Sequence, residues 1–410
     1  MIVWIAGTGW DSVPGTDKRL VGELASDHQL IWVDPPIRFP LGRPRDPVSM
    51  QGGSIGENII RVPVHTLPGI TKPVVRQLTT LRLNRAVRRA VAEAGTEPTA
   101  VVVSFPIAEF PRGLPGTKIL YVTDDWLGGS SLMGFSGSHV KRVLAANIES
   151  ADIVAAVTPG LLEQLGELGP VRHGVVLPNG CLPLGPSPAG TVRGREIGLV
   201  GQLNERLDMD LLEAMCRTGE QILVVGPRRD RGAGFGKRLD SFLAAKNVDW
   251  AGSVPAAELP KYFARMKVGV TPYVDSPFNR ASFPLKTLEY LSAGVPVVAT
   301  DLPAVRWLDS DHVQAAANTE DFLAKIAVQL DGRWTRSAER RRRQFAGEHS
   351  WAHRAADFSS IIGTGARSAR APDPAGREYP QQRNEGIDVR QQHTTTAEAI
   401  HGRGHPKLRT

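Results

Sequence analysis

The sequence predicts two α/β domains in tandem, each built on a doubly wound parallel sheet. Short runs rich in β-branched apolar residues alternate with helical stretches, which is the pattern of βαβ units. The alternation stops once, in a segment dense in glycine and proline between Asn179 and Arg195, and then restarts. A chain of 410 residues, 41% of them hydrophobic, also has enough apolar material for two cores of ordinary size.

The first half of the chain carries this pattern from its beginning. A buried strand is expected at residues 2–6, which read IVWIA, and a helix over about Lys18 to Ala25. The strands expected after this helix are LIWVDPP at 30–36, AVVVSFP at 100–106, KILYVTDD at 118–125 and DIVAAVTP at 152–159. We therefore assign residues 1–178 to a first domain.

The second half repeats the pattern after the linker of residues 179–195. Helical segments of ordinary length separate its expected strands. These strands are EIGLVG at 196–201, QILVVG at 221–226, VDWAG at 248–252, VGVTPY at 268–273, VPVVAT at 295–300 and VQAAA at 313–317. We assign residues 196–346 to a second domain.

The last part of the chain has a different composition. From about Gly363 the apolar periodicity is lost, and Pro, Gln, Arg, Thr and Gly become frequent. Such a composition cannot bury enough apolar surface to offset the conformational entropy that folding removes. The sequence therefore predicts a disordered tail over residues 363–410.

Charge and cysteine content narrow the partners and the compartment. The 49 Lys and Arg against 42 Asp and Glu give a net charge of +7, which favours anionic partners such as nucleotide phosphates or lipid headgroups. No nucleic-acid-binding module accompanies this charge, so the run Arg340–Arg343 is interpreted as a solvated helix face or as part of a phosphate-attracting field. The two cysteines, Cys181 and Cys216, fit no metal-site spacing and suit a reducing, cytoplasmic compartment.

The sequence offers no candidate for a membrane-crossing segment. Its first residues lack the charged and long apolar regions of a signal peptide, and no run approaches the roughly 18 to 20 apolar residues that crossing a bilayer requires. Any membrane contact is therefore expected to be peripheral.

The stretch most informative about function runs from Ser282 to Pro303 and reads SFPLKTLEYLSAGVPVVATDLP. Pro284 suits the first turn of a helix, Gly294 suits the left-handed residue that ends it, and VPVVAT suits a buried strand. Unpaired N–H groups at the helix start would face the edge where parallel sheets bind ligands, and they attract phosphate. The start of this helix, Ser282 to Leu285, is therefore a candidate substrate site.

Two charged residues lie just inside this helix. Lys286 and Glu289 are three residues apart and share one helix face. A cation near a diphosphate, with a carboxylate beyond it for ribose hydroxyls, is what a nucleotide-sugar site needs. Taken alone, the pair fits a solvated ion pair equally well.

The stretch as a whole resembles the donor-binding signature of retaining GT-B glycosyltransferases, in which a helix carries a glutamate for the ribose and is followed by a G-x-P-V-V strand. The positions of that signature are occupied here by Glu289, Gly294, Pro296, Val297 and Val298. The commoner pattern has a second acidic residue eight positions before the glutamate, where this chain has Ala281. The version with P-L-K and E-Y-L is closer to bacterial teichuronic acid and exopolysaccharide glycosyltransferases.

Other segments resemble this family in the same order. SADIVAAVTPGLLEQL resembles the last strand and helix of the N-terminal domain, VLPNG the entry to the linker, IGLVGQLNERLDMDLL the first strand and loop of the C-terminal domain, and HSWAHRAADFSSII the closing helix, which we assign to residues 347–362. The resemblance is specific from about Ser150 to Ile362 and holds only in outline before that.

The resemblance implies the GT-B fold, with two Rossmann-like domains facing a central cleft, and it implies roles for particular residues. A basic residue after the first strand of the second domain, here Arg206, would meet the donor diphosphate, and the backbone around Ser253, Val254 and Pro255 would frame the nucleobase. It also implies retention of anomeric configuration without a required metal or a cofactor. Arg206 and Lys286 would then carry the catalytic task of neutralising the leaving diphosphate.

The first domain offers two further candidates. Gly7, Gly9 and Ser12 with Asp34 match a dinucleotide fingerprint only weakly, because its third glycine is missing, so we expect a tight turn in which Gly9 lets a substrate approach the backbone. Asp125, with its neighbour Asp124, ends a strand. A carboxylate there could orient an acceptor hydroxyl, cap a helix or lie in a solvated loop, and these alternatives stay open.

A basic helix is expected between Lys72 and Arg89, a stretch with six basic residues and no acid. One face would present Arg82, Arg85 and Arg89, and another would present the apolar residues Leu83, Val87 and Val91. Such a helix can lie on an anionic membrane surface, or it can be an ordinary domain helix with a charged outer face.

Taken together, the sequence predicts an enzyme that moves a sugar from a nucleotide diphospho-sugar to a saccharide or lipid-linked acceptor, in cell-surface polysaccharide or glycolipid synthesis. A position at the inner face of the plasma membrane would suit this role. Two alternatives remain. A sugar-nucleotide epimerase shares the architecture but needs acid and base groups that the sequence does not identify, and Ala281 leaves open a protein that binds a nucleotide sugar without catalysis.

Overall fold

The computed structural model describes residues 1–368 except residue 13 and the segments 39–51, 70–71, 131–132 and 186–193, and it leaves residues 369–410 undescribed. The predicted disordered tail thus lies almost wholly outside the described residues. Part of the predicted linker, residues 186–193, lies outside them too.

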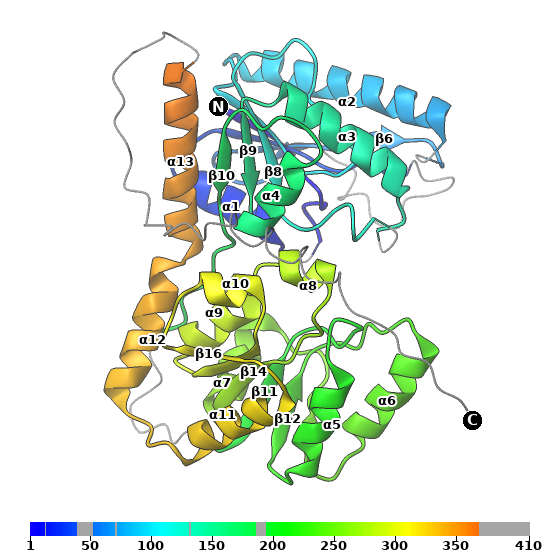
Figure 1. The fold of residues 1–410 in the computed structure, drawn as a ribbon. Coiled ribbons are helices and arrows are strands. Elements are labelled where there is room, and N and C mark those ends of the chain that lie inside the picture. Colours follow the sequence, from blue (N-terminus) through cyan, green and yellow to red (C-terminus); the bar gives the residue numbers. More distant parts are fainter. Residues whose placement is uncertain (13, 39–51, 70–71, 131–132, 186–193, 369–410) are drawn as a thin grey trace, which may run out of the picture. The chain divides into compact units, whose positions relative to one another are not determined.

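The first half of the chain contains an eight-stranded sheet in the order β10-β9-β8-β7-β1-β2-β5-β4 (Figure 1). Every neighbouring pair is parallel except β4 and β5. The strands are β1 (Ile2–Ile5), β2 (Leu30–Val33), β4 (Gly53–Ser54), β5 (Ile59–Val62), β7 (Ala100–Val103), β8 (Thr117–Val122), β9 (Ile153–Ala156) and β10 (Gly174–Val176). A separate parallel pair joins β3 (Ile37–Arg38) to β6 (His65–Thr66).

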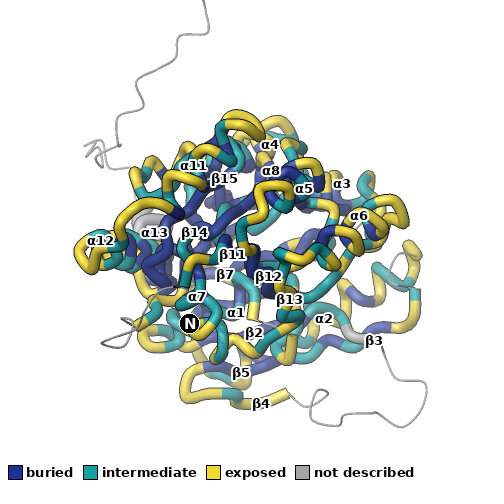
Figure 2. Tube along the Cα trace, turned by 90° about the horizontal axis from the view of Figure 1, so that it is seen from below, coloured by how far each residue is buried: buried dark blue, intermediate teal, exposed yellow. Residues whose placement is uncertain are grey.

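The central strands of this sheet are buried on both faces, as expected for a parallel sheet covered by helices. Every residue of β1, β2 and β7 is buried, including Trp4 and Trp32. Figure 2 shows this burial along the chain: the strands are mostly buried, and the helices that cover them have both buried and exposed residues. The helices of this half are α1 (Thr16–Leu24), α2 (Pro73–Ala94), α3 (Gly137–Ser150) and α4 (Pro159–Gly166).

The second half contains a six-stranded parallel sheet in the order β13-β12-β11-β14-β15-β16. Numbered within the sheet, this order reads 3-2-1-4-5-6, which is doubly wound with a switch point between β11 and β14. The strands are β11 (Glu196–Val200), β12 (Ile222–Val225), β13 (Val248–Trp250), β14 (Met266–Thr271), β15 (Val297–Thr300) and β16 (Val313–Ala316). The helices are α5 (Met209–Arg217), α6 (Ala233–Leu243), α7 (Leu259–Arg265), α8 (Pro277–Ala281), α9 (Leu285–Ser292), α10 (Pro303–Trp307), α11 (Thr319–Asp331) and α12 (Arg336–Glu348).

The predicted doubly wound α/β class is confirmed, and each strand expected from the sequence is present. The sequence analysis missed β3, β4, β5, β6 and β10. In β5 the reason is Arg61, a charged residue that interrupts the apolar run yet is buried. Its guanidinium is paired with Asp34 at 2.6 Å and with Asp11 at 2.8 Å.

The last described helix, α13 (Trp351–Ser368), packs against α1 of the first half (Figure 1). The ring of Phe358 lies 5.3 Å from that of Trp4 and 6.4 Å from that of Tyr121, so this helix contributes to the core of the first sheet. Our boundary at Gly363 is wrong, because the helix continues to Ser368. The helix includes Gly363 and Gly365, and each costs only about 1 kcal/mol, which is too little to end it.

Candidate functional site

A cavity of about 650 Å³ opens at the carboxyl ends of β11, β12 and β14. This is the switch point of the second sheet, where doubly wound folds bind ligands. Its volume falls within the roughly 300 to 1,000 Å³ of small-molecule sites. The lining comes from the segments that follow these strands, from the start of α9, and from Ser253, Val254, Ala256 and Leu259.

Two glycines form the floor of this cavity. Gly201 follows β11 and Gly226 follows β12, with φ angles of +148° and +149° that favour glycine. A Cβ atom on Gly226 would lie 1.8 Å from the carbonyl oxygen of Gly201. The Gly201 N–H also donates to the Val225 carbonyl at 2.9 Å, so the two strand ends are in close backbone contact. A ligand can therefore approach the main chain here without meeting a side chain.

Arg206 reaches the cavity from the loop after β11 and is held in place on several sides. Its Nε donates to Oδ1 of Asn279 at 2.8 Å. Its guanidinium lies 5.1 Å from the ring centroid of Tyr273 and 5.0 Å from that of Phe278, which are cation–π distances. Asn279 in turn donates to the carbonyls of Arg206 and Val274. The arginine is thus oriented before any ligand arrives, as a phosphate-binding group should be.

Lys286 lines the same cavity from the first turn of α9. Its Nζ lies 2.7 Å from Oε2 of Glu289, and both side chains are partly exposed. The ion pair considered from the sequence is therefore present, on the face of the helix that borders the cavity. Leu285 and Thr287 donate their N–H groups to the carbonyls of Phe283 and Pro284, so our expectation that the N–H groups at the helix start are unpaired is wrong for these two. The first turn is tightened by these short-range bonds.

The opposite end of α9 is fixed by arginines. Arg343 donates to the carbonyls of Ser292 and Ala293, and Arg342 donates to that of Gly294 at 2.7 Å. Cations at a helix C-terminus stabilise it through its dipole. Arg342 is buried, so the interpretation of the run Arg340–Arg343 as a solvated face is wrong for this residue. Gly294 has a φ of +77°, as predicted for the end of this helix.

The middle of α9 is bonded to the sheet through Tyr290. Its hydroxyl accepts from the Val200 N–H at 2.6 Å and donates to the Gly198 carbonyl at 2.9 Å. A Cβ atom on Gly269 would lie 2.4 Å from this ring, so the strand glycine makes room for it. Tyr290 therefore fixes the distance between α9 and the strands whose ends form the cavity.

The structure brings together many of the site residues proposed from the sequence. Those that line the cavity are Arg206, Ser253, Val254, Phe283, Pro284, Leu285 and Lys286. Glu289 lies next to the cavity through its pair with Lys286. Pro255 and Ser282 do not line it: Pro255 precedes the short 3₁₀ helix η2 (Ala256–Glu258), and the Ser282 hydroxyl donates to the Phe278 carbonyl at 2.8 Å.

Sequence reasoning missed Arg229 and Tyr273, which also line the cavity. The signal that could have identified them is position, because each lies just after a buried strand of the second sheet, β12 or β14, at the ligand-binding edge.

The structure does not bring Asp125 to this cavity. Its Oδ1 accepts from the Gly128 N–H at 2.8 Å, so the carboxylate caps its own turn. Its neighbour Asp124 contacts the segment before α9, because its Oδ1 is 3.5 Å from the Ser282 hydroxyl. Burial raises the pKa of Asp124, while the nearby Arg206 guanidinium acts in the opposite direction. Three alternatives were left open for this pair, and none describes Asp125 fully, because its carboxylate caps a turn and not a helix.

Gly9 lies in a loop after β1 that two buried carboxylates hold. The Trp10 N–H donates to Asp34 at 2.8 Å, and the Gly7 N–H donates to Asp17 at 3.0 Å. Asp34 also accepts from the indole of Trp32 and from Arg61, and it is fully buried, so it is a structural anchor and not the ribose-binding acid of a dinucleotide fingerprint. A Cβ atom on Gly9 would meet only ordinary contacts, so nothing in the loop itself requires glycine there.

Asp17 makes the stability of the first half depend on pH. Burial raises the pKa of this carboxyl to about 6 from an ordinary value of 3.8. The folded state therefore holds the proton over a window in which the unfolded state has released it, and stability present below pH 3.8 is lost as the pH rises through about 6. The loss corresponds to about 3 kcal/mol, at about 1.4 kcal/mol per pKa unit.

Asp17→Asn should remove this titration. The native chain loses stability as the pH rises and the variant does not, so the free energy of unfolding of the variant, relative to that of the native chain, is expected to increase by about 2.5 kcal/mol between pH 4 and pH 7. Urea unfolding across this pH range measures it. Parallel curves for the two proteins would show that Asp17 has an ordinary pKa in the folded state.

Among the described residues, no three His, Cys, Asp or Glu side chains lie close enough together to hold a metal ion. In the same part of the chain, no helix is long and apolar enough to cross a membrane.

Residues 194–331, which include this cavity, match the family model described as Glycosyl transferases group 1. This segment is thus similar to group 1 glycosyltransferase domains. The chain is also similar to a curated relative, named "Putative teichuronic acid biosynthesis glycosyltransferase TuaH" from Bacillus subtilis (strain 168), which is 30% identical over 168 residues. That alignment covers 39% of this chain and 42% of the relative, so the chain matches less than half of the relative's length.

Solved structures resemble most of the chain in their fold. Sucrose-phosphate synthase from Thermosynechococcus elongatus has a TM-score of 0.66 at 15% identity, covering 90% of this chain and 99% of that one. The lipopolysaccharide outer core galactosyltransferase WaaB has a TM-score of 0.58 at 15% identity, covering 88% and 98%. HepE from Anabaena, in complex with UDP and glucose, has a TM-score of 0.58 at 13% identity, covering 88% and 99%. The predicted GT-B fold is confirmed.

Proposed function

We propose that this protein transfers a sugar from a nucleotide diphospho-sugar to an acceptor hydroxyl. One observation carries the proposal. The cavity lining holds three cations, Arg206, Arg229 and Lys286, and, among the described residues, no Asp, Glu or His. A diphosphate is the part of a nucleotide sugar that needs such a cationic site, and it is also the leaving group of the reaction.

The roles of the residues follow from their contacts. Arg206, oriented by Asn279 and two aromatic rings, and Lys286, at the start of α9, neutralise the charge that develops on the departing diphosphate. The backbone around Ser253, Val254 and Pro255 frames the nucleobase, and Glu289 accepts from the ribose hydroxyls. UDP in the related HepE structure supports a nucleoside diphosphate as the leaving group. We further propose that the anomeric configuration is retained and that no metal is required.

The test is a panel of nucleotide sugars measured by two readouts. A cognate donor should raise the melting temperature by mass action, since it binds only the folded state, and the enzyme should slowly release the nucleoside diphosphate from it. Release is expected to persist in EDTA. A panel in which no nucleotide sugar stabilises the protein would contradict the proposal.

The two alternatives predict different results in the same assay. A binding protein without catalysis would be stabilised by a donor but would release no nucleoside diphosphate. An epimerase would convert the donor to its epimer, also without release of nucleoside diphosphate. Epimerisation needs acid and base groups near the sugar, and the absence of carboxylate and imidazole groups from the described cavity lining favours transfer.

We also propose a peripheral contact with anionic membranes through α2, in line with a lipid-linked acceptor and synthesis of a cell-surface polysaccharide or glycolipid. The relative's name, which refers to teichuronic acid biosynthesis, supports this role. The apolar face differs from the one expected, because Leu83 and Val87 are buried against the sheet. The exposed apolar residues are Val74, Leu78 and Leu81, at 68%, 42% and 64% exposure.

These three residues share one face of α2 with Arg85, since they are spaced by four, three and four residues. Arg82 borders the same face. Arg88 donates to the Arg112 carbonyl, and Arg89 is paired with Glu93, so both have partners within the protein. An apolar ridge flanked by arginines suits insertion just below the headgroups of an anionic bilayer.

Co-sedimentation with phosphatidylglycerol vesicles measures this contact. The native chain should bind at low salt and less at high salt, because each basic residue near the surface contributes about 1 kcal/mol that salt screens. A variant with Gln in place of Arg82, Arg85, Arg88 and Arg89 should lose most of the binding. A second variant, with Ser in place of Leu78 and Leu81, should bind more weakly with the same salt dependence. Equal sedimentation of all three proteins, or none at low salt, would favour a soluble acceptor.

A further inference from the structure

The first half of the chain has a cavity of about 360 Å³ beside the carboxyl end of β8. The loop after this strand, from Asp125 to Gly128, forms one wall, and α4 forms another. Leu161, Gln164 and Leu165 line it from α4, where a spacing of three and four residues places them on one helix face. We call this cavity the α4 groove. It shares no lining residue with the donor cavity of the second sheet, and its volume falls within the range of small-molecule sites.

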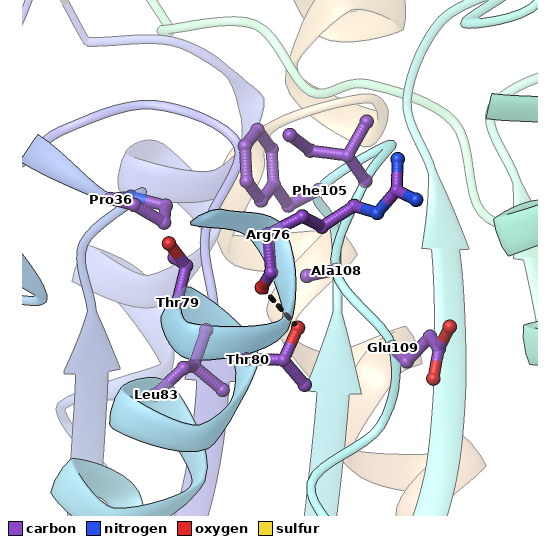
Figure 3. Close-up of a pocket in the computed structure, with 9 residues that line it drawn as sticks. Pro36, Arg76, Thr79, Thr80, Leu83, Phe105, Ala108 and Glu109 are labelled. Atoms are coloured by element: carbon purple, nitrogen blue, oxygen red, sulfur yellow. Dashed lines mark hydrogen bonds between the residues drawn. The ribbon is translucent and has the colours of Figure 1, made fainter. Parts of the chain in front are cut away.

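A second cavity in this half, beside the start of α2, is much smaller (Figure 3). It measures about 30 Å³, and Arg76, Thr79 and Phe105 are among the residues that line it. One water molecule needs about 10–15 Å³, so this cavity holds a few waters and excludes a sugar ring. Of these two cavities, only the α4 groove has room for a saccharide.

The lining of the α4 groove combines apolar side chains with a few polar groups. The apolar residues are Val122, Trp126, Leu127, Leu144, Leu161, Leu165 and Leu168. The polar residues are Asp125, Gln164 and Glu167. A sugar ring has apolar faces of C–H groups and hydroxyls around its edge, so it matches a mostly apolar pocket with a small number of polar partners.

The carboxylates of this lining can accept hydrogen bonds from a ligand. Oδ1 of Asp125 accepts from the Gly128 N–H at 2.8 Å, but no described residue donates to its Oδ2. A Cβ atom on Gly128 would collide with this second oxygen, so the glycine makes the position of the carboxylate possible. Glu167 and Gln164 are exposed, and their side chains have no hydrogen-bond partner within the described part of the chain. An ionised carboxylate only accepts, so hydroxyl groups are suitable partners.

Trp126 adds a donor to the same lining. The residue is only 5% exposed, yet none of the residues that the structure describes accepts from its indole N–H. A buried indole N–H usually has a hydrogen-bond partner. An oxygen atom of a ligand in the groove would provide one.

Both walls of the α4 groove contact α8, the helix that orients the donor arginine. A Cβ atom on Gly129, which follows the loop wall, would lie 3.3 Å from the ring of Phe278. The hydroxyl of Thr158, at the start of α4, donates to the Ala281 carbonyl at 3.0 Å. Phe278 in turn packs against the Arg206 guanidinium at 5.0 Å. The groove therefore lies beside the segment that forms the donor side of the site.

We propose that the α4 groove binds a saccharide unit of the acceptor that carries no acid group. The apolar side chains pack against a face of the sugar ring, the carboxylates of Asp125 and Glu167 accept from its hydroxyls, and the Trp126 indole donates to one of its oxygens. The same carboxylates repel a uronic acid or a sugar phosphate, whereas the cations of the donor cavity attract anions. The assignment to the acceptor rests on the proposed function.

The experiment uses the full chain labelled with ¹⁵N-tryptophan. The indole signal of Trp126, assigned with Trp126→Phe, reports on the α4 groove. The probes are the methyl glycosides of glucose, galactose, mannose, N-acetylglucosamine and N-acetylgalactosamine, with methyl glucuronide and methyl galacturonide as anionic counterparts. We expect a saturable shift of the Trp126 signal with at least one neutral glycoside and clearly weaker binding of both uronides. No saturable shift with any neutral glycoside, or a uronide that binds as tightly as the best of them, would overturn the proposal.

Two glutamates of the same segment provide a matched comparison. Glu167→Ala should weaken binding of the neutral glycoside about threefold or more, since it removes a hydrogen-bond acceptor from the groove. Glu163→Ala makes the same charge change one turn earlier, at an exposed residue that does not line the groove, and should leave the affinity unchanged. Equal effects of the two variants would contradict the site. Donor-induced stabilisation, measured on the same samples, tests the proposed function separately. Its absence would remove the assignment to an acceptor and leave the sugar binding of the groove intact.

Discussion

Gly226→Ala is expected to destabilise the second half of the chain by about 3 kcal/mol or more and to abolish donor binding. The added Cβ would lie 1.8 Å from the Gly201 carbonyl oxygen, which is main chain and cannot rotate away. The φ of +149° adds strain for any L residue. Strained backbone costs about 1–3 kcal/mol and overpacking about as much again, so the two effects together exceed those of most substitutions.

Gly219→Ala separates these two causes. Gly219 also has a positive φ, of +77°, but a Cβ there meets nothing within 4 Å. This control should cost only the conformational strain, about 1 kcal/mol, and should bind the donor normally. Urea unfolding and donor-induced thermal shifts of both variants give the comparison. Equal losses of stability in the two variants would contradict this explanation. They would show that the close contact between the ends of β11 and β12 adds nothing to the cost of the substitution.

The fold could be predicted from the sequence because its central strands are short, apolar and separated by regular helices. Strands buried on both faces, such as β1 and β14, leave a signal that does not depend on tertiary context. The missed strands lack this signal. β5 contains Arg61, and only its pairing with Asp34, 27 residues away, makes the burial of that arginine possible. A pairing of this kind is set by the tertiary fold and not by local pattern.

The donor side of the candidate site could be predicted for a similar reason. Arg206, Lys286 and the residues before Lys286 follow strand ends or begin a helix, so their positions at one edge of the sheet follow from the topology. The first half was harder. Asp124 and Asp125 are neighbours with the same chemistry, and what distinguishes them is tertiary and turn structure: Asp125 bonds to Gly128, and Asp124 contacts Ser282. On α2, both the buried and the exposed faces carry apolar residues, and the sequence alone did not assign them.

Lys286→Ala is expected to raise the dissociation constant of the donor about 10- to 100-fold and to lower turnover. A charge-assisted hydrogen bond to a phosphate is worth about 1.5–3 kcal/mol, and part of this is gained only as charge develops on the leaving diphosphate. Lys286 lines the cavity and is bonded to Glu289, so its removal also releases a carboxylate beside the phosphate site. The repulsion of that carboxylate adds to the loss.

The same domain contains a suitable control for the loss of an ion-paired lysine. Lys325 is paired with Asp321 at 2.6 Å, one turn apart on α11, and its side chain has the same 32% exposure as that of Lys286. Lys325→Ala should leave donor affinity and turnover unchanged, because Lys325 does not line the cavity. Donor binding by calorimetry and release of nucleoside diphosphate are measured for both variants. Unchanged kinetics in Lys286→Ala would mean that its pair with Glu289 is an ordinary surface ion pair, worth less than about 1 kcal/mol and without a role in binding the diphosphate.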